Sequence, residues 1–344
     1  MTKVKICGIT NLEDALVSAK FGADALGFNF YEKSPRYIAP ENAREIIEQL
    51  PTEVLKVGVF VNEDLEEIVE IAKTAKLDAV QLHGEETPEF VRQLKQKTNL
   101  EIIKAFRVSP DFAPEDVLKY TDTDAILLDA YSPKEHGGTG ETFDWEIAKK
   151  VQEIFPKMYL AGGLNDNNIV RAIDNLKPFA VDSCSGIEIE KGLKDEIKLI
   201  NFVIKGKTDL SKMSERNLFG LLSAIHLKPA MYLGKKSLTY LFTFFCGFDL
   251  ADNLGSKIFN AKEVLFNDFS DFVQHKFKQG RSAMGWSTRI LEKVDNDEEK
   301  AVDLFFALLE EFKLEKELLT LEIEQWEKTS DEDLQKFDQN LEKN

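Results

Sequence analysis

The chain has 344 residues, 43% of them hydrophobic, and a formal net charge of −17 at pH 7. This length fits one large or two ordinary domains, and the hydrophobic share is typical of globular proteins. The acidic excess disfavours attraction to nucleic acid or to anionic lipid, so the sequence predicts no nucleic-acid partner and no membrane partner.

The cysteine pattern and the first residues favour a cytoplasmic protein. Cys7, Cys184 and Cys246 lie far apart and include no CxxC pair, so neither a disulfide framework nor a zinc site is predicted. The first predicted strand starts almost directly after Met1, which leaves no room for a secretory signal. No apolar run approaches the roughly 18 residues that a membrane-spanning helix needs. We therefore expect a cytoplasmic location and a reducing compartment.

Short runs rich in Val, Ile, Leu or Phe predict eight β-strands in the first part of the chain. They are Lys3–Gly8, Ala25–Phe30, Val54–Val61, Ala79–His83, Ile102–Val108, Ala125–Asp129, Met158–Gly162 and Ala180–Ser183. Amphipathic stretches such as Asp64–Ala72 separate the strands, with Asn11 and Asn62 as acceptable N-caps. The regular alternation predicts an α/β fold, a parallel sheet closed into a (β/α)8 TIM barrel. A doubly wound open sheet is the alternative, but the segment after the first strand is not its Gly-rich dinucleotide loop.

Beyond residue 206 the strand–helix alternation stops and helical periodicity with many Phe residues follows. We therefore expect two domains, a barrel over 1–206 and a smaller, mainly α-helical accessory domain over 210–344. The predicted helices are Glu215–His226, Ser237–Phe248, Glu263–Phe277, Ser287–Val294, Glu298–Phe312 and Asp331–Glu342. Aromatic residues at helical spacing indicate a shared core, and this domain is where we expect a protein partner to bind.

Two reactive residues stand at or near the C-terminal ends of predicted strands: Cys7 on the first and Asp129 on the sixth. In TIM barrels this end of the strands carries the catalytic groups. Because side chains alternate along a strand, turning Cys7 inward turns Lys5 inward too. The same alternation predicts inward side chains at Asn29, Gln81, His83, Leu127, Asp129 and Asp182.

Polar side chains gathered at one mouth of a barrel indicate a hydrogen-bond network or a ligand, because unpaired buried polar groups are costly. For Lys5 and Asp182, an ion pair inside the barrel explains the pattern at least as well as a direct catalytic role. Small residues follow the last two strands, as Gly162 and Gly163 and as Ser185 and Gly186. Their backbone N–H groups are accessible where barrel enzymes hold phosphate, which predicts a phosphorylated small molecule as ligand.

Several motifs together resemble phosphoribosylanthranilate isomerase of tryptophan biosynthesis over about residues 1–206. In order, they are Lys5-Ile6-Cys7-Gly8-Ile9-Thr10, Ser34-Pro35-Arg36-Tyr37, Gly58-Val59-Phe60-Val61-Asn62, Val80-Gln81-Leu82-His83-Gly84, Leu128-Asp129, Gly137-Gly138-Thr139-Gly140 through Phe143-Asp144-Trp145, Ala161-Gly162-Gly163-Leu164, and Val181-Asp182 through Ser185-Gly186-Ile187-Glu188. One departure is Ser183-Cys184, where the family more often has a hydrophobic or polar residue followed by Ser or Asn.

The resemblance implies an Amadori rearrangement of an aminoaldose phosphate to an aminoketose phosphate, without metal or redox cofactor. It assigns Asp129 as general acid and Cys7 as general base, and Arg36 as the residue that pairs with the anthranilate carboxylate. It places Gln81, His83 and Asp182 against the substrate; His83 would otherwise be tempting as the base. As a base, Cys7 needs a pKa below its ordinary value, which Lys5 could help to provide.

The remaining expectations concern the loop after the sixth strand and two alternative functions for the chain. Tyr131–Thr142, with His136 and its glycines, is expected to be a mobile lid over the substrate. A barrel kept as a scaffold or sensor, with the C-terminal domain as an interaction module, is the alternative function. The related isomerisation of histidine biosynthesis uses paired aspartates in its family, and Cys7 on the first strand argues against it.

Overall fold

The computed structural model describes residues 1–109, 111–130, 145–208, 218–253, 265–278 and 285–317. These residues fall into two compact units, Met1–Lys212 and Met213–Asn344. The predicted lid Tyr131–Thr142 and the predicted helix Asp331–Glu342 lie outside the described residues.

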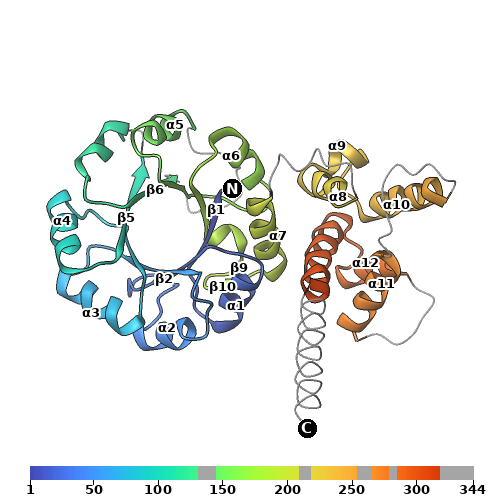
Figure 1. The fold of residues 1–344 in the computed structure, drawn as a ribbon, viewed down its shortest axis with the longest axis horizontal. Coiled ribbons are helices and arrows are strands. Elements are labelled where there is room, and N and C mark those ends of the chain that lie inside the picture. The colour runs from blue at the N-terminus through green and yellow to red at the C-terminus, as the bar shows by residue number, and fades with distance from the viewer. Residues whose placement is uncertain (110, 131–144, 209–217, 254–264, 279–284, 318–344) are drawn as a thin grey trace, which may run out of the picture. The chain divides into compact units, whose positions relative to one another are not determined.

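The first unit is a closed barrel of eight strands, each hydrogen-bonded in parallel to its neighbours, with the first also paired to the eighth. The strands are β1 (Lys3–Cys7), β2 (Ala25–Asn29), β3 (Leu55–Phe60), β4 (Ala79–Leu82), β5 (Glu101–Val108), β6 (Ala125–Ala130), β7 (Met158–Leu160) and β8 (Ala180–Ser183). Figure 1 shows the strands as an inner ring with the helices outside it. The predicted TIM barrel is confirmed, and each predicted strand is present.

Helices connect the strands across the outside of the barrel. They are α1 (Leu12–Lys20), α2 (Pro40–Ile47), α3 (Leu65–Ala75), α4 (Pro88–Lys97), α5 (Trp145–Ile154), α6 (Ile169–Leu176) and α7 (Glu196–Lys207). The expected N-cap Asn11 is confirmed, since its side chain accepts a hydrogen bond from the Asp14 N–H. The expected N-cap Asn62 is wrong: Asp64 caps α3, while Asn62 has φ 53° and accepts from the Glu85 N–H.

Two local features differ from the regular pattern of strands and α-helices. Between β5 and β6 the connection carries a 3₁₀ helix, η1 (Pro114–Lys119), rather than an α-helix. Pro114 occupies its first turn, where the missing N–H is tolerated, and the segment ends after two turns. After β8 the chain forms a short 3₁₀ helix, η2 (Ser185–Ile187), and an antiparallel hairpin of β9 (Glu188–Glu190) and β10 (Leu193–Lys194), which the sequence did not predict.

The barrel interior is filled by small and medium side chains from most of its strands. The buried set is Ala25, Val57, Ala79, Ile103, Ala105, Ala125, Leu127, Tyr159, Ala161 and Ala180. The inward direction predicted for Leu127 is therefore confirmed. Because the interior is packed in layers, only side chains near the ends of the strands reach an opening.

The second unit is helical in all its described parts, with α8 (Leu218–Leu227), α9 (Pro229–Leu233), α10 (Leu238–Asn253), α11 (Leu265–Lys276), α12 (Trp286–Lys293) and a further helix over 298–317. The sequence missed only the single-turn α9 among these helices. Phe269, Phe305 and Phe306 are buried, and Phe269 contacts Trp286 edge to face at 5.7 Å, so the aromatic core is confirmed. Phe242 contacts Trp286 but is 38% exposed, so it lies at the edge of this aromatic cluster. None of the described helices is long and apolar enough to span a membrane.

Candidate active site

Three ionisable side chains predicted from strand parity lie at the carboxyl end of the barrel. Cys7 is the last residue of β1, and Asp129 is the residue before the end of β6. Asp182, in β8, is held so close to both that their negative charges raise its pKa, in addition to the larger effect of burial. The fold therefore brings residues that are far apart in the sequence close enough at one mouth of the barrel for their charges to interact.

Cys7 lies in an environment that favours the thiolate. Its pKa is well below the ordinary value, first because the Cys184 thiol donates a hydrogen bond to it. Burial acts in the opposite direction, while the positive charges of Lys5 and Lys194 lower the pKa further. The expectation that Lys5 would help to lower this pKa is confirmed.

Lys5 and Asp182 form an ion pair inside the barrel, with Nζ and Oδ1 2.9 Å apart. They are register partners on the neighbouring strands β1 and β8, so strand closure places them side by side. Burial works against both charges. For Lys5, the attraction of the negative charges of Asp182 and Cys7 outweighs the effect of burial, so its pKa is raised. For Asp182, the effect of burial outweighs the attraction of Lys5, so its pKa is raised to about 6. The expected pair is confirmed, and Lys5 is also within contact of the Cys7 sulfur.

A hydrogen-bonded row connects Gln81, His83 and Asp129. Gln81 Nε2 lies 2.8 Å from His83 Nδ1, and His83 Nε2 lies 3.3 Å from Asp129 Oδ2. His83 with its proton on Nε2 accepts from the Gln81 amide and donates to Oδ2 of the Asp129 carboxyl group. Oδ2 can accept this bond while Oδ1 carries the acid proton, so the row orients the Asp129 side chain. The buried Oε1 of Gln81 has no hydrogen-bond partner among the described residues, as expected of an atom that receives a ligand.

Arg36 lies in the loop between β2 and α2 and makes a two-pronged ion pair with Glu188. Its Nε and Nη2 donate to the two carboxylate oxygens at 2.8 and 2.6 Å. Glu188 also accepts from Lys194 Nζ at 3.1 Å, and these cations lower its pKa although burial would raise it. Asn29 holds the same loop, because its side chain donates to Ser34 and accepts from the Tyr31 N–H. Lys194 was missed by the sequence reasoning; its place in the unexpected hairpin gave no local signal.

The two Gly-containing loops after β7 and β8 lie against each other. Gly162 and Gly163 both have positive φ, at 85° and 67°. A Cβ on Gly186 would lie only 2.1 Å from the Leu164 carbonyl oxygen, and the Ser183 hydroxyl donates to that oxygen at 2.6 Å. Only a residue without a side chain allows this approach. The loops that carry the four predicted phosphate-binding residues are therefore in direct contact.

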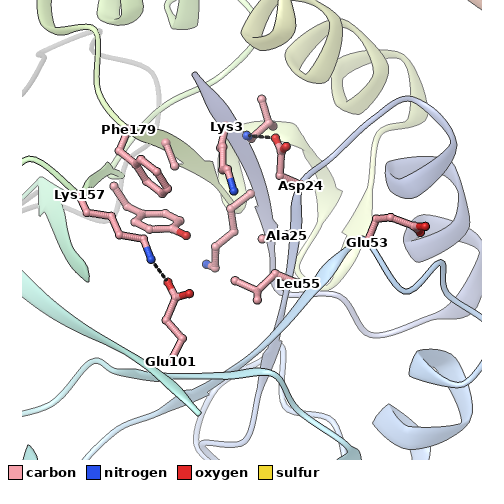
Figure 2. A pocket seen from close by; sticks show the side chains of 12 residues that line it. Lys3, Asp24, Ala25, Glu53, Leu55, Glu101, Lys157 and Phe179 are labelled. Atoms are coloured by element: carbon pink, nitrogen blue, oxygen red, sulfur yellow. Dashed lines mark hydrogen bonds and ion pairs between the residues drawn. The ribbon is translucent and has the colours of Figure 1, made fainter. Parts of the chain in front are cut away.

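A cavity of about 160 Å³ at the opposite end of the barrel is a different feature. Figure 2 shows its charged lining, in which Lys157 reaches Glu101 at 2.8 Å. Lys3, Ala25, Leu55 and Glu101 are the first residues of their strands, so this cavity lies at the amino ends, away from Cys7 and Asp129. That end of TIM barrels serves stability rather than chemistry, and we assign no site to it.

A parallel (β/α)8 barrel with a buried cysteine of lowered pKa, a partly exposed carboxyl group and Gly-rich loops at its carboxyl mouth belongs to the class of TIM-barrel enzymes. The sequence model of N-(5'phosphoribosyl)anthranilate (PRA) isomerase matches residues 4–205. The chain belongs to this family through its barrel.

Individual relatives agree with the family model. The N-(5'-phosphoribosyl)anthranilate isomerase of Geobacter sp. (strain M21) is 49% identical over 211 residues, covering 60% of this chain and 98% of the relative. The crystal structure of phosphoribosyl anthranilate isomerase from Thermotoga maritima has a TM-score of 0.57 and 49% identity, with 60% of this chain and 99% of that chain covered. A second structure, 46% identical with TM-score 0.54 and coverage of 60% of this chain and 99% of that chain, is phosphoribosyl anthranilate isomerase in complex with reduced 1-(o-carboxyphenylamino)-1-deoxyribulose 5-phosphate.

Proposed function

We propose that this chain is a phosphoribosylanthranilate isomerase of tryptophan biosynthesis. The reaction is the Amadori rearrangement of N-(5'-phosphoribosyl)anthranilate to 1-(2-carboxyphenylamino)-1-deoxyribulose 5-phosphate. Family membership supports the activity, together with a relative whose crystal structure contains a reduced form of that product. The observation in this chain that carries the proposal is Cys7, a buried cysteine with a lowered pKa at the mouth that also holds Asp129.

In the proposed mechanism Asp129 acts first, as the general acid. It donates a proton to the furanose ring oxygen, and the C1'–O bond breaks to leave a protonated Schiff base between C1' and the anthranilate nitrogen. The contact of His83 Nε2 with Asp129 Oδ2 fixes the direction of the carboxyl group toward the sugar. Asp129 is partly exposed, which is consistent with direct access to the substrate.

Cys7 then acts as the general base. Its thiolate removes the proton from C2', and the electron pair moves to form an enolamine, which tautomerises to the ketone. Lys5 and Lys194 stabilise the thiolate before the reaction, so little free energy is needed to generate the base. Asp182 is held by Lys5 and, with Gln81, lines the mouth beside these two groups.

The substrate's two anionic ends have separate proposed binding groups. Arg36 offers a planar guanidinium to the anthranilate carboxylate, held in place by Glu188. Gly162, Gly163, Ser185 and Gly186 present backbone N–H groups to the phosphate from the two contacting loops.

The test is a steady-state assay of the full chain with the two catalytic residues changed. Cys7→Ala and Asp129→Asn are each expected to lower kcat by about 100-fold or more, the usual contribution of a positioned base or acid. Cys246→Ala and Asp116→Asn are matched controls: Cys246 is an exposed cysteine, and Asp116 is an exposed carboxylate that pairs with Lys119 within η1. Activity of Cys7→Ala near that of the unmodified chain would refute the role of the thiolate.

Complementation separates the isomerase from the alternative of a scaffold or sensor. A tryptophan auxotroph lacking the isomerase is expected to grow when it carries residues 1–206, and not when it carries the same segment with Cys7→Ala. Failure of the full chain to restore growth, with the protein present in the cells, would favour the scaffold alternative.

The helical unit keeps the role proposed from the sequence, an accessory domain over 210–344 that binds a protein partner. The large apolar side chains Met231, Tyr232, Tyr240 and Phe242 of α9 and α10 are exposed, and such side chains are enriched in protein interfaces. The cytoplasmic location also stays a prediction.

A further inference from the structure

A second cysteine lies beside the proposed catalytic thiolate and has no part in the proposed mechanism. Cys184 directly follows β8, and both Cys7 and Cys184 are free thiols. Cys246, the third cysteine, lies on α10 of the helical unit and is exposed.

The strand register places the two cysteines next to each other. In the β1–β8 pair, Lys5 is opposite Asp182 and Ile6 is opposite Ser183. The next residues are Cys7, the last residue of β1, and Cys184, the first residue after β8. Neighbouring strands are about 4.8 Å apart, within the range of about 4.4–6.8 Å that separates the Cα atoms of disulfide-bonded cysteines.

The side chains of the two cysteines point to the same side. Lys5 and Asp182, two residues earlier on each strand, both point into the barrel, where they form their ion pair. Strand side chains repeat with a period of two, so Cys7 follows Lys5 on that face. Cys184 lies just beyond the end of β8, and its sulfur is held against Gly8, the residue after Cys7. Their thiols are hydrogen-bonded to each other, so a covalent bond between the sulfur atoms needs little movement.

The surrounding contacts hold this pair in place. Lys194 Nζ donates to the carbonyl oxygens of both cysteines, at 2.6 Å for Cys7 and 3.2 Å for Cys184. Gly8 has φ 74°, and a Cβ there would lie 2.8 Å from the Cys184 sulfur. The glycine therefore allows the second sulfur to lie directly against the backbone that follows Cys7.

We propose that Cys7 and Cys184 form a reversible disulfide when the protein meets a peroxide, and that this disulfide switches the isomerase off. The Cys7 thiolate attacks one peroxide oxygen, the O–O bond breaks, and the leaving hydroxide takes up a proton. Cys7 becomes a sulfenic acid. The Cys184 sulfur then attacks the Cys7 sulfur, the S–O bond breaks, and the departing hydroxide takes the Cys184 proton. Two thiols and one hydrogen peroxide give one disulfide and two waters.

The charges at the site suit both steps. Cys7 is the attacking group because its thiolate is stabilised by Lys5 and Lys194. Cys184 remains a thiol beside that negative charge, which raises its pKa, as burial does. Once Cys7 is a neutral sulfenic acid, this negative charge is gone. The cations Lys194 and Arg36 then favour the Cys184 thiolate that completes the bond.

The consequence for catalysis rests on the proposed function. A Cys7 sulfur bound in a disulfide cannot accept the C2' proton, so the isomerisation loses its base. The substrate must reach the same mouth, so a peroxide can reach it as well. Reversible disulfides in reducing compartments are mostly catalytic or redox-sensing, which agrees with a switch rather than a structural bridge.

The test treats the full, reduced chain with hydrogen peroxide and follows two readouts. Peptide mass spectrometry without reductant is expected to find the Cys7 and Cys184 peptides joined with the loss of two hydrogen atoms. Activity is expected to fall by about 100-fold or more, in step with the joined peptide, and to return with dithiothreitol. The first readout is independent of the proposed reaction.

Variants distinguish the switch from simple oxidation of a reactive thiol. Cys184→Ser cannot form the bond, so Cys7 proceeds to sulfinic acid, and dithiothreitol does not restore its activity relative to the untreated variant. Cys246→Ser is expected to behave as the unmodified chain. If peroxide yields no joined peptide in the unmodified chain, or if its activity loss is as irreversible as in Cys184→Ser, the switch is wrong. A joined peptide with full activity would instead support the thiol pair and contradict Cys7 as the base.

Discussion

Placing a methyl group at Gly186 tests whether the two contacting loops hold the substrate phosphate. In the Gly186→Ala variant the new Cβ would lie 2.1 Å from the Leu164 oxygen and 3.0 Å from its carbonyl carbon. Both atoms belong to the backbone, so the loops must separate rather than a side chain rotate. Restoring a normal contact needs a shift of about 1 Å, and a displacement of that size at a binding group costs up to about 100-fold in rate.

We therefore expect kcat/KM of Gly186→Ala to fall by about 10- to 100-fold, or about 1.4–2.7 kcal/mol of transition-state binding. Most of the change should appear in KM. Inorganic phosphate, used as a competitive inhibitor, should lose affinity in parallel because it needs the same N–H groups. The assay is steady-state kinetics with substrate and with phosphate, on the full chain.

The control is Gly247→Ala in α10, where the added Cβ meets no atom of the described residues within 4 Å outside the adjoining backbone of its own helix. Its kinetics should match the unmodified chain. Overpacking in Gly186→Ala also costs about 1–3 kcal/mol of stability, and a circular dichroism melt will show whether the variant is folded at the assay temperature. A folded Gly186→Ala with unchanged kcat/KM and unchanged phosphate inhibition would refute the assignment of these loops to the phosphate.

Two further predictions concern the cations at the mouth. Lys194→Met removes a positive charge near Cys7, so the thiolate is less stable and the pKa of Cys7 rises. The acidic limb of the pH profile of kcat/KM should therefore move to higher pH. At a pH below the limb, kcat/KM should fall about tenfold for each unit of that shift. An unmoved limb would contradict this electrostatic role. Arg36→Lys replaces the two-pronged contact with Glu188 and should lower kcat/KM by about 10- to 100-fold, while phosphate inhibition is unchanged. Weaker phosphate inhibition in this variant would show that Arg36 acts at the phosphate end of the substrate, and it would contradict the assignment of Arg36 to the anthranilate carboxylate.

The residues of each strand determined the barrel and the direction of its side chains. Alternation is a local property with a period of two, so Lys5, Cys7 and Leu127 could be turned inward from the sequence alone. The ends of β1 and β6 were predicted to within one residue from the ends of the apolar runs, which placed Cys7 and Asp129 at the carboxyl mouth.

Local reasoning was weaker where the chain leaves the regular pattern. Asn62 has a side chain that can cap a helix, but Asp64 caps α3 instead. Asn62 adopts φ 53°, and its side-chain oxygen accepts a hydrogen bond from the Glu85 N–H in the loop after β4. The 3₁₀ helix η1 and the hairpin of β9 and β10 are too short to produce a clear periodicity.

The tertiary structure alone decided which polar groups meet. Closure of β8 onto β1 pairs residues 177 positions apart, Lys5 with Asp182, and brings Cys184 to Cys7. Glu188 meets Arg36 across 152 positions. These contacts depend on the register at which the barrel closes, a property of all its strands together, whereas the inward direction of each side chain depends only on its own strand.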